Sequence, residues 1–217
     1  MKIEWMGHSC FVITSKDGTV IVTDPYEPNA FGGQLTYKPV KAKADIVTIS
    51  HDHADHNYPR MLSGSYDVVR DAGVYKGIKV EAVKAAHDPE GGKLRGKNTI
   101  FVFEVDGIRI AHLGDLGHIP TDEQAAKLKS VDVMLIPIGG FFTIDPREAD
   151  MVIAKVKPKI AIPMHFCTKG CKFNIAPVEK FLAGKTFERK NVTFVELKKE
   201  ELIGQTKIVV LEPAMLP

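Results

Sequence analysis

Eleven residues, TISHDHADHNY at positions 48–58, constrain this chain more than any other part of its sequence. They place three histidines and two aspartates within the six positions from His51 to His56. The cluster follows DIVTIS at 45–50, a run that is β-branched and short enough to be a buried strand. Burying imidazoles and carboxylates together costs free energy unless a partner compensates, and both are good donors for zinc, iron, manganese or nickel. The pattern His-x-His-x-Asp-His therefore predicts a metal site at the end of a strand, against the alternative of a polar loop of solvated histidines.

The spacing within the cluster indicates that one loop could serve two ions. In an extended segment, residues two apart point the same way, so His51, His53 and Asp55 would converge while His56 turns to the other side. A carboxylate also supplies the hard oxygen that a bridging position needs. The loop would thereby reach two adjacent metal positions.

The composition narrows the class of protein. With 217 residues, 44% of them apolar and 26% charged, the chain is long enough for a substantial core, and we expect one domain over residues 1–217. A dedicated nucleic-acid binder would usually carry more than the formal net charge of +2, so no nucleic-acid partner is expected. No basic region followed by an apolar run opens the chain, and no stretch approaches the roughly 20 apolar residues of a membrane span. We therefore expect a cytoplasmic protein that takes a small-molecule substrate and has no membrane partner, and we leave a homo-oligomer open.

The rest of the chain alternates strands with short helices. Asp-Gly dipeptides at 17–18 and 106–107 predict hairpin turns. Thr121 and Asp145 are predicted N-caps, each directly ahead of a helix. Strands outnumber helices, and the later helices separate strands, so an α/β sandwich is the economical architecture. We expect strands at 2–14, 19–23, 45–50, 79–86, 99–105 and 108–113 and within VDVMLIPIGG, KIAIPMHF, NVTFVEL and TKIVVLE, and helices from the N-cap Thr121 to about 129, at 146–156 and within APVEKFLAG.

Three cysteines, Cys10, Cys167 and Cys171, are an odd number and do not suggest a disulfide framework. Two of them follow His165 in HFCTKGC, and thiolates are good zinc ligands. A closed zinc site needs four donors, however, and only one histidine lies nearby. The spacing favours two ordinary thiols at Cys167 and Cys171, and their role is left open.

The histidine cluster resembles the signature of the metallo-β-lactamase-fold superfamily, and the resemblance extends over nearly the entire chain. The superfamily pattern continues with a histidine after a strand, an aspartate in a Gly-Asp turn and a late histidine. This sequence supplies His87 in AAHDPEGG, Asp115 in HLGDLGH and His165 in IPMHF. Each falls at the end of a predicted strand, as ligands held by a sheet should.

Within the superfamily the chain most resembles the UlaG-like group of metal-dependent hydrolases, through GHSCF, TDPY, HLGDLGH, PIGGFFTID and IPMHF. The resemblance implies an α/β (α+β) fold of four layers, αββα, with two sheets face to face, helices outside and the metals at one edge. It implies two divalent ions, zinc first, with Mn²⁺, Fe²⁺ or Ni²⁺ as alternatives. It also implies the ligands: His51, His53 and His87 around one ion, Asp55, His56 and His165 around the other, and Asp115 bridging the two.

Other polar residues are expected around this centre. His8 would lie at the metal edge, in contact with a ligand or in the pocket wall, with a plain strand histidine as the alternative. Asp24 would accept the N–H of a ligand imidazole, or else simply start an Asp-Pro turn. His118 could reach the pocket and shuttle a proton, or cap the turn at the surface. His112 would face away from Asp115 and is expected to be structural.

Together these assignments predict a metal-dependent hydrolase in which a metal-bridged hydroxide attacks an ester-like bond of a small substrate, namely a lactone, thioester or phosphodiester. Asp55 is the candidate to orient the nucleophile, and His118 is the candidate acid for the leaving group. Arg95 in GGKLRGKN could bind an anionic group of the substrate, against the alternative of an exposed glycine-rich turn. The competing functions are a nuclease of the same superfamily and a non-catalytic metal-binding module.

Overall fold

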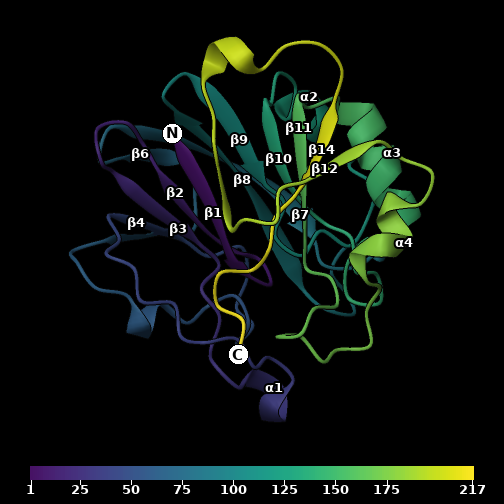
Figure 1. Ribbon diagram of the computed structural model, residues 1–217, viewed down its shortest axis with the longest axis horizontal. Coiled ribbons are helices and arrows are strands. Elements are labelled where there is room, and N and C mark those ends of the chain that lie inside the picture. The colour runs from purple at the N-terminus through teal and green to yellow at the C-terminus, as the bar shows by residue number, and fades with distance from the viewer.

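The computed structural model describes residues 1–217 and contains two β-sheets that pack face to face (Figure 1). Six strands form the first sheet in the order β13-β1-β2-β3-β4-β5, and eight form the second in the order β12-β14-β11-β10-β9-β8-β7-β6. The first sheet consists of β1 (Lys2–Gly7), β2 (Cys10–Thr14), β3 (Val20–Thr23), β4 (Ile46–Thr48), β5 (Asp67–Val69) and β13 (Phe194–Glu196). The second consists of β6 (Gly73–Tyr75), β7 (Ile78–Ala86), β8 (Lys97–Val105), β9 (Ile108–His112), β10 (Val133–Pro137), β11 (Ile160–Met164), β12 (Phe187–Arg189) and β14 (Lys207–Val210). The predicted mixed α/β sandwich of two sheets is confirmed.

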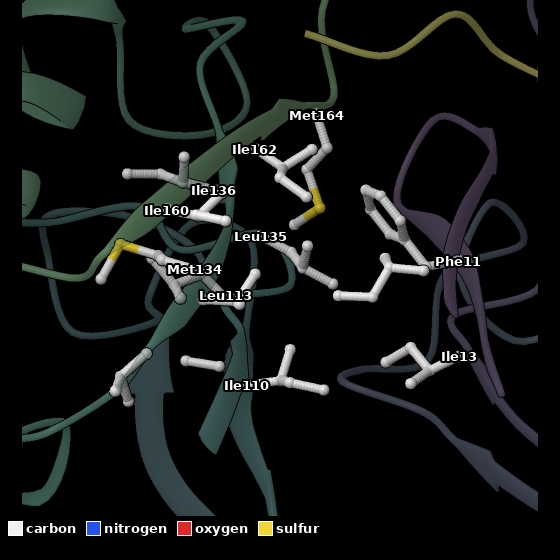
Figure 2. Packing of buried hydrophobic residues seen from close by; sticks show 14 of the residues in the cluster. Phe11, Ile13, Ile110, Leu113, Met134, Leu135, Ile136, Ile160, Ile162 and Met164 are labelled. Atoms are coloured by element: carbon white, nitrogen blue, oxygen red, sulfur yellow. The ribbon is translucent and has the colours of Figure 1, made fainter. Parts of the chain in front are cut away.

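The main core lies between the sheets. Phe11 and Ile13 on β2 point across to Ile110, Leu135 and Met164 on the second sheet (Figure 2). Strands β10 and β11 are buried along their whole length, as expected of strands that are covered on both faces. Burial of this apolar surface is the main force that holds the two sheets together.

Helices cover the outer face of the eight-stranded sheet (Figure 1). They are α2 (Asp122–Lys127), α3 (Pro146–Val156) and α4 (Val178–Leu182), and α3 buries the stripe Ala149, Val152 and Val156. Both predicted N-caps are confirmed, because Thr121 and Asp145 each accept the backbone N–H three residues on within a capping box. No helix of the protein combines the length and apolar character that a bilayer crossing requires.

The outer face of the six-stranded sheet carries a loop layer instead of long helices. Outward-facing Val22 and Val47 belong to a second apolar cluster with Leu35 and Tyr37, which lie in the proline- and glycine-rich loop after β3. This loop includes the four-residue α1 (Ala30–Gly33), and the short 3₁₀ turns η1 (Pro59–Met61) and η2 (Lys199–Glu201) lie further along the chain.

Two parts of the strand prediction need correction. The predicted strand 2–14 is two antiparallel strands, because the chain reverses between Gly7 and Cys10. Gly7 has a φ of 125°, and a Cβ there would lie 2.8 Å from the Tyr37 ring, so the turn requires glycine. Strands β5, β6 and β12 were not predicted, since each is short and mostly not buried and no apolar run marks it. Both predicted hairpins, β2-β3 and β8-β9, are antiparallel as expected.

The strand directions bring several carboxyl ends to one edge of the molecule. Strand β3 pairs parallel with β4, and β9 pairs parallel with β10, which in turn pairs parallel with β11. Strand β7 runs the same way as β9, because each is antiparallel to β8. The residues that follow β7, β9 and β11 therefore share an edge. The contact of His56 with Asp115 brings the residues after β3 and β4 to the same edge, where loops can carry functional groups on a rigid frame.

Candidate metal centre

Every ligand expected from the sequence lies just beyond the end of one of these strands. The loop after β4 carries the cluster from His51 to His56, and His87 follows β7 directly. Asp115 follows β9 and His165 follows β11. Strands fixed by the core thus position side chains that come from four separate parts of the sequence.

The expected ligands fall into two main groups, within each of which the candidate ligand atoms lie within 4.8 Å of one another, while a third group, Asp24 with His51 and His56, overlaps both. One group is His51, His53 and His87; the other is His8, Asp55, His56 and His165. The loop is a turn and not an extended segment, since the N–H groups of His56 and Asn57 both donate to the carbonyl of His53, at 3.0 and 2.9 Å. For this reason Asp55 lies with His56, and the simple alternation expected of residues two apart does not hold.

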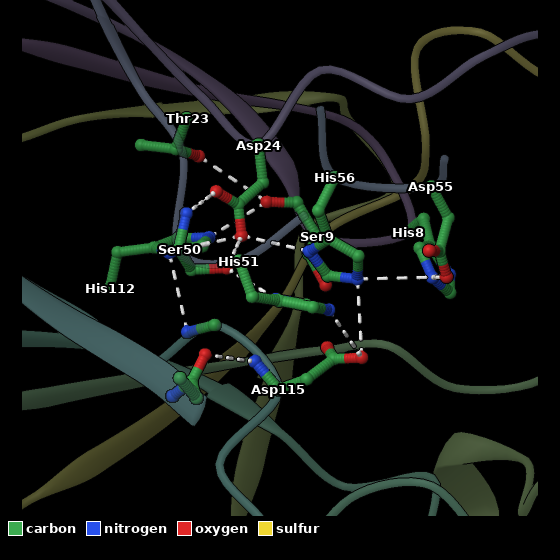
Figure 3. Close-up of polar contacts among 12 residues, drawn as sticks. His8, Ser9, Thr23, Asp24, Ser50, His51, Asp55, His56, His112 and Asp115 are labelled. Atoms are coloured by element: carbon green, nitrogen blue, oxygen red, sulfur yellow. Dashed lines mark hydrogen bonds and ion pairs between the residues drawn. The ribbon is translucent and has the colours of Figure 1, made fainter. Parts of the chain in front are cut away.

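Asp115 lies between the two groups, and Figure 3 shows its carboxylate facing the ring of His56. Its Oδ2 is 3.2 Å from Nε2 of His56, 3.2 Å from Nε2 of His87 and 3.3 Å from Nε2 of His165. A single carboxylate oxygen therefore faces imidazoles from both groups, which is the place a bridging ligand would take.

Several buried polar atoms at this centre have no hydrogen-bond partner in the protein. They include Nε2 of His51, Oδ1 of Asp55 and Oδ1 of Asp115. Leaving such atoms unpaired costs about 1–3 kcal/mol each, and more where they are charged. A cation would satisfy imidazole nitrogens and carboxylate oxygens together, so the residues present fit one or two divalent metal ions.

A network behind the ligands fixes the orientation of two imidazoles. Nδ1–H of His56 donates to Oδ2 of Asp24 at 2.8 Å, and the backbone N–H of Ser50 donates to Oδ1 of Asp24, also at 2.8 Å (Figure 3). The hydroxyl of Ser50 lies 2.9 Å from Nδ1 of His51. Both histidines are thus held through Nδ1, which leaves Nε2 directed at the centre. Asp24 thus accepts the N–H of one of the expected ligand imidazoles. The contact of Ser50 with His51 was not predicted, although the two residues are adjacent in the sequence.

His8 lies at the centre, as expected of a residue in contact with a ligand. It is fully buried, and its Nε2–H donates to Oδ2 of Asp55 at 3.0 Å. Its ring centroid is 4.1 Å from that of His165. The hydrogen bond fixes Asp55 and leaves Oδ1 of that carboxylate free.

Burial and neighbouring charges set the pKa values of these groups, and at His56 a cation would have to replace the bound proton. Burial lowers the pKa of His51 to about 3 and that of His8 to about 4, so both rings are neutral at pH 7. Burial opposes a charge on His56, but the carboxylates of Asp115 and Asp55 raise its pKa well above the usual range. Burial likewise opposes ionisation of both carboxylates, yet neighbouring histidines lower their pKa values, so both stay ionised.

A cavity of about 250 Å³ opens onto the centre. Arg95 lines it and is half-buried there. Next to His87, Asp88 accepts the backbone N–H groups of Glu90, Gly92, Leu94 and Arg95 at 2.8–3.0 Å and so shapes the loop that carries Arg95. The lining residues are Phe31, His53, Asp55, His87, Leu94, Arg95, Asp115, Phe142, His165 and Phe173. The three phenylalanines were not predicted. They lie more than 30 residues apart in the sequence, and the segments that carry them show no periodic pattern of apolar residues.

Two further histidines are bound to backbone instead. His118 accepts the N–H of Ala86 at Nε2, at 3.2 Å, and donates from Nδ1 to the carbonyl of Ile119, at 2.9 Å. It borders a separate depression, so the structure does not bring the candidate acid to the centre. His112 is buried and donates from Nε2 to the carbonyl of Ser9 at 2.7 Å, as a structural histidine would.

The two late cysteines lie outside the centre. Cys167 is exposed and Cys171 is buried, and both are free thiols. Neither belongs to a group of clustered metal-binding residues. The interpretation of two ordinary thiols remains the simpler one.

Comparison with known proteins relates this arrangement to one family. A family model described as a β-lactamase superfamily domain matches residues 2–165. A UPF0173 metal-dependent hydrolase from Archaeoglobus fulgidus is 33% identical over 204 residues, covering 77% of this chain and 84% of that protein. A second, from Thermoplasma acidophilum, is 29% identical over 193 residues with the same coverage.

Solved structures agree with the sequence matches. A protein from Thermotoga maritima, described as a candidate Zn-dependent hydrolase of the metallo-β-lactamase superfamily, has a TM-score of 0.79 and 38% identity, with 97% of each chain covered. A metallo hydrolase from Ignicoccus hospitalis has a TM-score of 0.64 at 21% identity, covering 98% of this chain and 95% of that one. The second likeness is one of fold alone.

Proposed function

Because the chain belongs to the metallo-β-lactamase superfamily, as a metal-dependent hydrolase, we propose that it hydrolyses an ester-like bond of a small anionic substrate at a two-metal centre. The bond classes in question are lactones, thioesters and phosphodiesters, and zinc is the first choice of metal, ahead of Mn²⁺, Fe²⁺ and Ni²⁺. One observation carries the proposal: buried ligand atoms without partners converge at the floor of a cavity.

The two groups of ligands would each hold one ion. His51, His53 and His87 would bind the first, Asp55, His56 and His165 the second, and Asp115 would bridge them. When bound, divalent ions polarise a substrate oxygen and lower the pKa of a water, so that a nucleophile is present at neutral pH. No side-chain nucleophile is required.

Residues of the chain would orient the reaction. His8 holds Asp55 through Oδ2, so Oδ1 is available to orient the attacking water. Arg95 at the cavity wall would bind the anionic group of the substrate, and no ion pair competes for its guanidinium. The geometry of His118 gives no support to the idea that it protonates the leaving group.

Narrower assignments follow from the same reasoning. We place the chain in the UlaG-like group on the motifs GHSCF and PIGGFFTID, and in the cytoplasm on its sequence features. Its near-balanced charge supports a small-molecule substrate over a nucleic acid.

Removal and return of metal tests the proposal. The purified protein is stripped with a chelator, reconstituted with Zn²⁺, Mn²⁺, Fe²⁺ or Ni²⁺, and assayed on lactones, thioesters and phosphodiesters with and without a carboxylate. We expect turnover to vanish on stripping and to return with metal, with the anionic substrates preferred. Turnover by the stripped protein would refute the metal-dependent scheme, while tightly bound metal without any turnover would favour a metal-binding module.

A further inference from the structure

Three phenylalanines line one side of the cavity above the metal centre, and we call Phe31, Phe142 and Phe173 the aromatic wall. Phe173 is the middle ring, 5.6 Å from the Phe31 centroid and 5.4 Å from the Phe142 centroid, with both pairs edge to face. The rings come from α1 and from the loops after β10 and β11, which meet at one end of the molecule (Figure 1). The wall thus forms an apolar surface next to ligands His53 and His165.

Phe142 and Phe173 pack in part against the second apolar cluster, but this packing leaves all three rings of the wall accessible to the cavity. Phe31 is 51% exposed, and Phe142 and Phe173 are only half-buried. Leu94, which lines the same cavity, is 62% exposed. Large apolar side chains gathered at the mouth of a cavity mark a surface that binds something, because exposing them to water has no benefit for folding.

Backbone strain supports the same view. Phe31 lies in the left-handed region at φ 53° and ψ 46°, and Phe141, whose ring centroid is 4.7 Å from that of Phe142, has a φ of 62°. Glycine adopts this conformation without strain, whereas a bulky residue rarely does. For a half-exposed phenylalanine, the free energy gained by packing is too small to offset the cost of the left-handed backbone. Residues strained in this way gather at ligand sites.

A positive charge, that of Arg95, lies beside the aromatic wall in the same cavity. The guanidinium carbon of Arg95 is 5.9 Å from the Phe142 centroid, and Arg95 lines the cavity beside the wall. A substrate that used both surfaces would carry a flat apolar group and an anionic group a short distance apart. The cavity of about 250 Å³ has room for one such group.

We propose that the aromatic wall is the specificity subsite for an aryl group of the substrate, next to the anion site at Arg95. The proposal rests on the proposed function, since it names the substrate class as an aryl-bearing, anionic ester-like compound. Aromatic rings bind other rings by offset or edge-to-face contact beyond the burial of apolar area, so an aryl group suits this wall better than an alkyl group of the same size.

Binding of three phosphonates tests the proposal without relying on turnover. Methyl-, cyclohexyl- and phenylphosphonate are titrated into the zinc-loaded protein by calorimetry. The phosphonate binds the metals in each case, and only the apolar group differs. We expect phenylphosphonate to bind about 10-fold more tightly than methylphosphonate, with cyclohexylphosphonate between them.

Variants locate the effect. Phe142→Ala and Phe31→Gly should each remove most of the phenyl preference and leave methylphosphonate binding unchanged. Phe31→Gly should also keep or raise the Tm, because glycine relieves the left-handed strain. Phe187→Ala, which removes an exposed phenylalanine on β12, is the matched control and should change neither quantity.

The outcomes separate the two claims. Equal binding of all three phosphonates, or a phenyl preference that survives in both variants, would overturn the aromatic wall as a subsite while the hydrolase stands. Cyclohexylphosphonate binding as tightly as phenylphosphonate would overturn the choice of an aryl group. Failure of every phosphonate to bind the zinc-loaded protein, together with no hydrolysis, would overturn both the subsite and the proposed function.

Discussion

The apolar core between the sheets and the polar cluster at their edge are both buried, yet they are built on opposite physical principles. In the core, side chains such as Leu135 and Phe11 are fully buried and satisfied by one another. In the cluster, atoms such as Nε2 of His51 and Oδ1 of Asp55 are buried without a partner. The first arrangement stabilises the fold, whereas the second costs free energy until a cation completes it.

This contrast separates stability from function in the molecule. The stability of the core offsets the free-energy cost of the unpaired polar atoms, because the core that fixes β9, β10 and β11 also fixes the loops at their carboxyl ends. Changes in the core should therefore act on folding, and changes in the cluster on metal and turnover. Four substitutions can break or sharpen this distinction.

Asp115→Asn should have the largest effect. The substitution removes the negative charge that faces Nε2 atoms of both groups, while the shape of the side chain is kept. We expect kcat/KM to fall about 10³-fold or more, with reduced metal content and an unchanged circular dichroism spectrum. Metal analysis and steady-state kinetics on the same preparation measure this. Full activity in Asp115→Asn would remove the bridging role.

Leu135→Ala should act on folding instead. Leu135 is fully buried on β10 in the main core, so truncation should lower the free energy of unfolding by about 3 kcal/mol. Denaturant titration gives this value, and kcat/KM per folded molecule should stay within about twofold of wild type. Met151→Ala on the exposed side of α3 is the control and should be near neutral. If Leu135→Ala lowered kcat/KM without lowering the free energy of unfolding, the assignment of stability to the core and of activity to the polar cluster would be wrong.

Asp24→Asn should weaken metal binding without touching a ligand directly. Asp24 accepts the Nδ1–H of His56 and the backbone N–H of Ser50, which holds both sides of the loop in place. We expect metal affinity to fall about 10–100-fold, measured by competition with a chromophoric chelator. Asp52→Asn lies in the same loop but pairs outward with Arg70, so it should change affinity little. Equal losses in the two variants would mean that loop charge, and not the hydrogen bond to His56, sets the affinity.

Arg95→Ala should have the smallest effect and act on substrate alone. Loss of the guanidinium should raise KM about 10-fold for anionic substrates and leave neutral substrates unchanged, with kcat and metal content unaffected. Lys93→Ala, an exposed cation in the same loop, is the matched control. An equal rise of KM for neutral substrates would show that Arg95 shapes the cavity and does not bind the anionic group of the substrate.

The sequence predicted what strands and local motifs determine. The strand at 45–50, the helix caps at Thr121 and Asp145 and the ligands at strand ends all follow from short-range patterns, and the superfamily resemblance supplied the pairing of ligands between two ions. The turn around His8 escaped prediction because its cause is distant, namely the contact of Gly7 with Tyr37.

The remaining features depend on distant segments meeting in space. Phe31, Phe142 and Phe173 form one wall only after three loops fold together, and no periodicity links them. His118 looked close enough to Asp115 in sequence to reach the pocket, but hydrogen bonds to Ala86 and Ile119 hold it elsewhere. Motifs at strand ends therefore predicted which His and Asp side chains cluster, whereas proximity along the chain predicted the position of His118 poorly.

Anomalous diffraction at the zinc edge, on crystals of the zinc-loaded protein, addresses the polar cluster most directly. We predict two peaks, one among His51, His53 and His87 and one among Asp55, His56 and His165, with Asp115 between them. The absence of any peak among these residues under saturating zinc would contradict the metal centre and everything inferred from it, provided that manganese and iron, measured at their own absorption edges, give no peak there either.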